Sequence, residues 1–147
     1  MRYILIPMLA LAIVSGSCGL KRKNPLDPVA DPDIIVPDMV SEVSTAASPA
    51  GASNKYVIIT WRSNSPITTS GYYVYRGLGY YSQYTVVDTV MVPNNPGTTT
   101  SCTHGAKPWH LVFPGEYYYK VSAFKEYPPH GRLEGRQSQP AWVRVPA

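Results

Sequence analysis

Short runs in which apolar and polar residues alternate recur along most of this chain, and they limit what it can fold into. In the run YVIITW, Val57, Ile59 and Trp61 share one face at a period of two residues, as in a β-strand with one buried face. Turn residues separate this run from similar ones, a spacing typical of an all-β sandwich. We expect seven strands, at residues 40–44, 56–61, 71–76, 84–90, 98–103, 117–124 and 141–145.

Composition supports strands and argues against nucleic-acid binding. The chain has 147 residues, enough for one ordinary domain with short appendages, and its 15 Pro and 12 Tyr favour strands over helices. The formal net charge is +4, and apart from the run Lys21-Arg22-Lys23 the basic residues are scattered among acids. Because nucleic-acid-binding proteins concentrate Lys and Arg on one face, we expect no nucleic-acid partner.

Four motifs, in order along the chain, carry a resemblance to a known family. They are ITW in the second expected strand, SGYYVYRG in the third, FPGEYYYKVSAF in the sixth and SQPAWVRV in the last. Residues 37–147 therefore resemble a fibronectin type III domain, which implies an all-β fold, a seven-stranded antiparallel immunoglobulin-like sandwich. The resemblance implies a structural core of Trp61, Tyr72, Val74, Tyr117, Tyr119, Val121 and Ala123. It also implies that Tyr117 is a tyrosine corner, whose hydroxyl bonds to backbone upstream.

Two stretches depart from the family pattern. Residues 98–114 form a longer segment than usual, which leaves the position of the fifth strand open. Residues 125–137 are expected to form a long loop between the last two strands. Some family members carry an Arg-Gly-Asp integrin site in this loop, but GRLEG at 131–135 contains no such tripeptide. Integrin binding is therefore not implied.

The first 17 residues have the layout of a secretory signal peptide. One basic residue precedes an apolar run at 4–14, and small residues follow at 15–17. The apolar run is shorter than the roughly 20 residues that a membrane-spanning helix needs. The sequence VSGSC resembles the lipobox of bacterial lipoproteins, although Ser15 stands where that family usually has Leu. The resemblance implies cleavage before Cys18, lipidation of its thiol, and a lipid-anchored protein of the bacterial cell envelope, in the outer membrane if the cell has one. An ordinary cleaved leader and an uncleaved anchor are the alternatives.

A spacer is expected between the lipid and the domain, at residues 18–36. It contains Pro25, Pro28 and Pro32 and shows no apolar period before Ile34. Such segments favour an extended polyproline-like conformation of about 3.1 Å per residue, which predicts a reach of roughly 50 Å. If Cys18 carries lipid, Cys102 has no disulfide partner. A bridge between Cys18 and Cys102 requires a different cleavage site.

The titratable residues give weak support for an enzyme. Cys102, His104 and His110 form a loose trio that could act as a metal site or as a thiol and imidazole pair. Structural zinc usually takes four ligands with paired spacings. The sequence contains no phosphate-binding glycine loop, nucleophile elbow or His-Glu-x-x-His motif. We therefore expect no enzyme activity, no metal and no cofactor.

Strand alternation predicts an outward-facing aromatic strip. If Tyr72 and Val74 face inward, their neighbours face outward, and the same holds for the sixth and last strands. The candidate binding face contains Tyr73, Tyr75, Tyr118 and Trp142, flanked by Lys120 and Arg144. Such residues anchor interfaces and stack on sugars, but they also pair across strands without any ligand. Tyr80, Tyr81 and Tyr84 either extend the strip or cover the sheet edge.

These observations leave three hypotheses for function. In the first, the domain of a membrane-anchored lipoprotein is a non-catalytic binding or display module for a protein or glycan partner. In the second, it is a structural spacer or assembly component of the envelope without a dedicated ligand site. The third and least supported is a metal or thiol enzyme built on the Cys and His residues. The fold by itself does not select among them.

Overall fold

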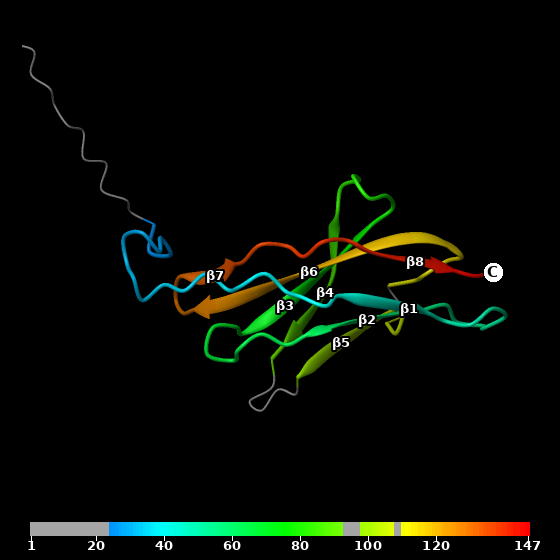
Figure 1. Ribbon diagram of the computed structural model, residues 1–147, viewed down its shortest axis with the longest axis horizontal. Coiled ribbons are helices and arrows are strands. Elements are labelled where there is room, and N and C mark those ends of the chain that lie inside the picture. Colours follow the sequence, from blue (N-terminus) through cyan, green and yellow to red (C-terminus); the bar gives the residue numbers. More distant parts are fainter. Residues whose placement is uncertain (1–23, 93–97, 108–109) are drawn as a thin grey trace, which may run out of the picture.

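Two antiparallel β-sheets form the molecule in the computed structural model, which describes residues 24–92, 98–107 and 110–147. The first sheet has three strands, in the order β1 (Ser44–Ala47), β2 (Val57–Arg62) and β5 (Thr99–His104). The second has five: β4 (Thr85–Met91), β3 (Gly71–Gly77), β6 (Gly115–Tyr127), β7 (Gly131–Glu134) and β8 (Ala141–Val145). The predicted all-β sandwich of antiparallel strands is confirmed (Figure 1). Cys18 and the leader lie outside the described residues.

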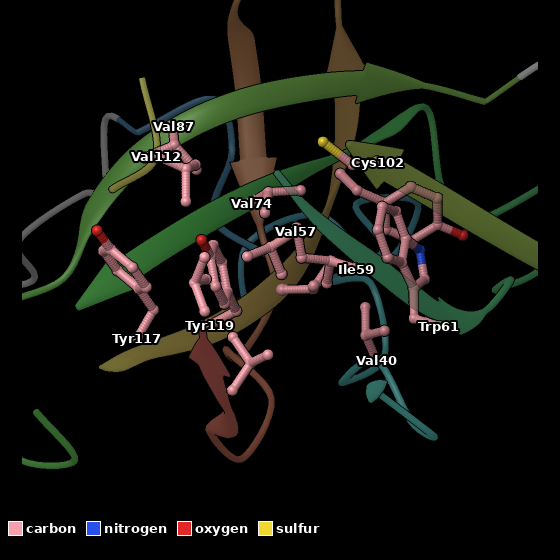
Figure 2. Packing of buried hydrophobic residues seen from close by; sticks show 14 of the residues in the cluster. Val40, Val57, Ile59, Trp61, Val74, Val87, Cys102, Val112, Tyr117 and Tyr119 are labelled. Carbon is pink, nitrogen blue, oxygen red and sulfur yellow. The ribbon is translucent and has the colours of Figure 1, made fainter. Parts of the chain in front are cut away.

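The core lies between the two sheets and comes from the alternation seen in the sequence. Val57, Ile59 and Trp61 of β2 are fully buried, while Ile58 between them is exposed. Trp61 packs edge-on against Tyr72 of β3, with ring centroids 5.2 Å apart. Figure 2 shows these β2 side chains gathered with Val74 and Tyr119. All residues that the family resemblance placed in the core are at most 7% exposed, namely Trp61, Tyr72, Val74, Tyr117, Tyr119, Val121 and Ala123.

Tyr117 makes the backbone bonds that the family resemblance implied. Its hydroxyl donates to the carbonyl oxygen of Phe113 at 3.0 Å and lies 3.3 Å from the amide nitrogen of the same residue. Its ring is 7% exposed and belongs to the core cluster. The segment before β6 is therefore fastened to the strand it precedes.

The first strand begins later than expected. Residues 40–44 were the expected strand, whereas β1 covers Ser44–Ala47. Glu42 has a φ of 56°, a left-handed conformation that interrupts extended backbone before β1. Val40 nevertheless packs in the core with 2% exposure, and the Arg62 amide donates to the Ser41 carbonyl at 3.1 Å.

The expected loop at 125–137 is wrong, because most of it belongs to a β-hairpin. β6 continues to Tyr127 and pairs with β7, with Phe124 opposite Glu134. After β7 the chain stays beside β6, since the Gly135 amide donates to Ala123 and the Ser138 amide to Val121. β7 and β8 thus line successive parts of β6, where the sequence predicted a single last strand.

The spacer is also more compact than expected where it is described. Asn24, Asp27 and Asp31 each precede a proline, and each side chain accepts a bond from the amide two residues on. These Asx turns compete with the extended conformation, so the expected polyproline-like extension is wrong for residues 24–33. The repeated pair of Asn or Asp followed by Pro is the feature of the sequence that indicates these turns.

The end of this segment docks on the sandwich. The Tyr127 hydroxyl donates to the Ile35 carbonyl at 3.0 Å and accepts from the Ile35 amide at 2.7 Å. In Figure 1 the blue segment lies at the β7 end of the molecule, and the C-terminus lies at the opposite end. The chain therefore enters the domain at the β6–β7 hairpin.

Candidate binding face

The outer face of the five-stranded sheet carries the predicted aromatic strip. Tyr73 and Tyr75 of β3 lie opposite Ser122 and Lys120 of β6. On the other side of β6, Tyr118 lies opposite Trp142 of β8, and Glu116 lies opposite Arg144. The strand pairing therefore brings all six predicted residues to one sheet. The strip divides into two groups with different surroundings.

The first group, here called the covered group, consists of Tyr73, Tyr75 and Phe124. The rings of Tyr73 and Phe124 have centroids 4.6 Å apart, and those of Tyr73 and Tyr75 are 6.4 Å apart. Arg132 of β7 lies over this group, with its guanidinium carbon 4.5 Å from the Phe124 ring centroid. Its Nη1 also donates to the Tyr73 hydroxyl at 3.2 Å. Phe124 is fully buried.

The expectation that Tyr75 is exposed is wrong, because its side chain is only 8% exposed. It lies outside the core cluster, so its outward direction follows the alternation, but residues of the outer face cover it. Its hydroxyl donates to Glu134 Oε1 at 2.5 Å, and the Ser122 hydroxyl donates to the same oxygen. Burial, together with the hydrogen bond to the Glu134 carboxylate, raises the pKa of Tyr75 to about 12. Tyr75 is thus a packing residue of the covered group.

Phe124 belongs to this face although the sequence expectation omits it. Alternation from Tyr118 through Lys120 and Ser122 places it on the outer side of β6, so the signal was available. It lies opposite Gly71 of β3, whose missing side chain leaves room for the ring. A Cβ at Gly71 would lie 2.5 Å from Phe124 Cζ.

The second group, here called the open group, consists of Tyr80, Tyr81, Tyr118 and Trp142. Tyr80 lies edge-on to Tyr81 at 4.8 Å and to Tyr118 at 6.2 Å between ring centroids. Tyr81 is 95% exposed, Trp142 53% and Tyr80 47%. These exposed fractions are far above those of Tyr75 and Phe124. The β3–β4 hairpin therefore extends the strip, one of the two alternatives for its tyrosines.

Tyr84 and Lys120 hold the base of the open group. The Lys120 ammonium lies 4.2 Å from the centroid of the Tyr84 ring, a cation–π contact. The Tyr84 hydroxyl donates to the Tyr80 carbonyl at 3.1 Å, which fixes the backbone of the hairpin. Burial raises the pKa of Tyr84. Arg144 is exposed beyond Trp142 on β8, so a cation flanks the group on each side.

The open group lies far from the point where the chain enters the domain. Ile35 docks on Tyr127 at one end of β6, and Tyr118 lies nine residues away along the same strand. At about 3.3 Å per residue these positions are roughly 30 Å apart. Figure 1 shows the β3–β4 hairpin and β8 on the side of the molecule away from the blue segment.

The Cys102 thiol bonds to a carboxylate. Cys102 is a free cysteine, 6% exposed, and its Sγ donates to Asp88 Oδ2 at 3.4 Å. Asp88 also accepts from Lys107 Nζ at 2.7 Å. Burial and the neighbouring Asp88 charge raise the pKa of Cys102 to about 12. A nucleophilic cysteine needs a lowered pKa, so this environment opposes thiolate chemistry.

His104 is a core residue on β5. It is 2% exposed, and its Nδ1 lies 2.8 Å from the Tyr119 hydroxyl. Its ring centroid is 6.0 Å from that of His110. Burial, followed by the charge of Arg76, lowers the pKa of His104 to about 4, so it is neutral at pH 7. The structure thus brings His104 near His110 but pairs it with a tyrosine.

No group of three or more His, Cys, Asp or Glu residues among 24–92, 98–107 and 110–147 is placed to hold a metal ion. Within the same residues, no helix has the length and apolar character required to cross a bilayer.

Comparison with solved structures finds similar folds. The chain is similar to an Fn3-like protein from Clostridium thermocellum, with 22% sequence identity, a TM-score of 0.47, and coverage of 76% of this chain and 92% of that chain. No protein-family model and no curated protein matches the chain. The fold class, an antiparallel all-β sandwich, rests on the strand pairing described above.

Proposed function

We propose that this protein is a non-catalytic binding module, held at a bacterial membrane by lipid on Cys18, that captures a protein or glycan partner with the open group. The observation that carries the proposal is the exposure of Tyr81 in the β3–β4 hairpin and of Trp142 on β8. Aromatic side chains of this kind are the usual energetic anchors of interfaces, and their faces stack on sugar rings. Lys120 and Arg144 add positive charge beside them.

The direction of display supports the same proposal. A chain anchored at its N-terminal end would enter the sandwich at Ile35, close to the β6–β7 hairpin. The open group lies on the far part of the five-stranded sheet, roughly 30 Å away along β6. A partner could then reach Tyr81 and Trp142 without meeting the membrane.

The test is a double substitution within the open group of the intact protein. Tyr81→Ser with Trp142→Ser removes the two most exposed members, neither of which belongs to the core cluster. Val29→Ser with Ile67→Ser is the matched control, because these side chains are 78% and 76% exposed and lie outside the strip. Loss of one anchor typically costs about 2 kcal/mol or more, a roughly 30-fold loss of affinity.

The measurement is capture from the cell envelope of the source organism, with periodate-treated and protease-treated extracts as separate arms. Loss of capture in the open-group variant, with capture retained in the control, supports the proposal. Sensitivity to periodate identifies a glycan partner, and sensitivity to protease a protein. Equal capture by both folded variants refutes a role for the open group.

A structural spacer is the second candidate function. The docking of Ile35 on Tyr127 favours it, since the entering chain and the sandwich are joined by two hydrogen bonds and so form a stiffer unit than a free tether. Under this function, shortening or lengthening residues 24–34 alters envelope assembly, while the open-group variant behaves like wild type. Under the binding function, the change in length leaves envelope assembly unaltered, while the open-group variant loses capture of the partner.

Lipidation is tested separately. The Cys18→Ala variant should lose incorporation of labelled fatty acid and leave the membrane fraction, because stable anchoring requires acyl chains. Label that remains on the variant would refute lipidation at this residue.

A further inference from the structure

Arg76 occupies a position where strand alternation calls for an inward side chain. It follows Tyr72 and Val74 on the same face of β3, and both of those residues are fully buried in the core. The residue opposite Arg76 on β6 is Tyr119, another core residue. The Arg76 guanidinium carbon lies 5.9 Å from the centroid of the Tyr117 ring, at the end of the sandwich. A half-buried cation thus stands where the pattern would place an apolar residue.

The Arg76 guanidinium has no acceptor within the part of the chain that the structure describes. It takes part in none of the side-chain hydrogen bonds there, and the ion pairs of that part involve Arg62, Lys107 and Arg132. A guanidinium carries five N–H donors in a planar fork that matches an anionic group with two oxygens.

A pocket of about 570 Å³ opens beside Arg76. His104 and Tyr117 contribute to its lining. Four apolar side chains that are at least half exposed also line it, namely Leu78, Val86, Leu111 and Phe113. The volume lies within the range of roughly 300 to 1,000 Å³ that is typical of small-molecule sites. Apolar walls with one oriented charged group are the usual composition of such sites.

We propose that this pocket binds a small organic anion with an apolar body, such as an aryl or acyl chain that ends in a carboxylate or sulfonate. Arg76 binds the anionic group through paired N–H donors, and the exposed apolar side chains pack against the body. None of the residues that line this pocket belongs to the open group. The proposal therefore stands or falls independently of the proposed function.

Two fluorescent probes with the same ring system test the proposal. Anilinonaphthalene sulfonate carries an anionic group, and phenylnaphthylamine is its uncharged counterpart. Wild-type protein should bind the sulfonate at least roughly 10-fold more tightly than the amine, the ratio expected for a charge-assisted hydrogen-bonded pair. Arg76→Leu should lower the affinity for the sulfonate to that for the amine and leave the latter unchanged. Arg76→Lys should fall between, since it keeps the charge but loses the fork.

Arg144→Leu is the matched control, because it removes the same charge from the outer face. It should leave sulfonate binding unchanged. Methyl chemical shifts of Leu78, Val86 and Leu111 should move on addition of the sulfonate, which locates it in this pocket. If Arg76→Leu does not fold, the affinity of Arg76→Lys for the sulfonate and the methyl shifts of the wild type still test the proposal. Equal affinities of wild type for the two probes, unchanged sulfonate binding by Arg76→Lys, or shifts confined to the open group would overturn the proposal.

Discussion

The covered and open groups are made of the same kinds of residue, along the outer side of one sheet and its β3–β4 hairpin, yet only one of them is accessible. Tyr75 and Phe124 are at most 8% exposed, whereas Trp142 and Tyr81 are 53% and 95% exposed. The difference comes from the strand that pairs with β6 beside each group. Arg132 and Glu134 of β7 contact the covered group, whereas β8 contributes Trp142 to the open group. An outward-facing aromatic strip is therefore accessible to a partner only where no other segment of the chain covers it.

The largest expected effect is on stability, from truncating one aromatic residue in each group. Phe124→Ala should lower the free energy of unfolding by about 3 to 5 kcal/mol, because it removes a fully buried ring and leaves a cavity. Trp142→Ala should change it by less than about 1 kcal/mol, since half of that side chain is already in water. Urea unfolding of both variants provides the measurement. Similar losses in the two variants would show that the open group is also a packing unit.

A glycine beside each group provides the second comparison: Gly71 lies opposite Phe124, and Gly79 precedes Tyr80. Gly71→Ala should cost about 1 to 3 kcal/mol, because its Cβ would lie 2.8 Å from the Val90 carbonyl oxygen and closer still to the Phe124 ring. Gly79→Ala, in the hairpin of the open group, meets its nearest atom at 3.7 Å, an ordinary contact. It should therefore be neutral or stabilise by up to about 1 kcal/mol, through the smaller entropy of the unfolded chain. Thermal unfolding distinguishes the two; a neutral Gly71→Ala would mean that Phe124 can move aside.

The side of the sheet on which each aromatic residue lies could be predicted from the sequence, and its exposure could not. Alternation depends only on the backbone geometry of one strand, so Tyr73, Tyr75 and Tyr118 all lie on the outer face as expected. The exposed fraction of each side chain depends on which other segments of the chain pack over it. The cover of Tyr75 comes from Glu134, 59 residues away, and requires a hairpin where the Pro- and Gly-containing sequence predicted a loop.

The Arg76 pocket shows the same limit. Strand alternation places Arg76 inward, but the absence of a partner among the described residues, and the exposed Leu111 beside it, follow from how β3 and the segment before β6 meet in space. Local pattern determines orientation, whereas long-range pairing determines which polar groups find partners.

The third comparison uses alkaline pH and the hydroxyl of Tyr75. Its pKa is raised to about 12 in the folded protein, from an ordinary value of 10.0, so the folded state holds the proton over that range while the unfolded state loses it. The resulting stability is fully present below about pH 10 and is lost as the pH rises towards about 12. The free energy of unfolding should fall more steeply for wild type than for Tyr75→Phe across this range. Other buried tyrosines titrate in both proteins, so their contribution cancels in the difference. Parallel curves would indicate that Tyr75 titrates alike in both states and is not held by the covered group.

The smallest expected effect tests whether β7 alone separates the two groups. Arg132→Ala removes the guanidinium from Phe124 and Tyr73 and breaks the pair with Glu126, in which both side chains are more than one-third exposed. Such pairs contribute about 0 to 1 kcal/mol, and the lost packing of the arginine stem adds a similar amount. We expect a stability loss near 1 kcal/mol, with the exposed Arg136→Ala near zero as control. Tyr73 and Phe124 then face solvent. Acrylamide should therefore quench the tyrosine fluorescence of Arg132→Ala more strongly than that of the wild type. If stability and quenching both match wild type, neighbouring parts of the sheet cover Phe124, and the difference between the two groups is a property of β6 and β3 themselves.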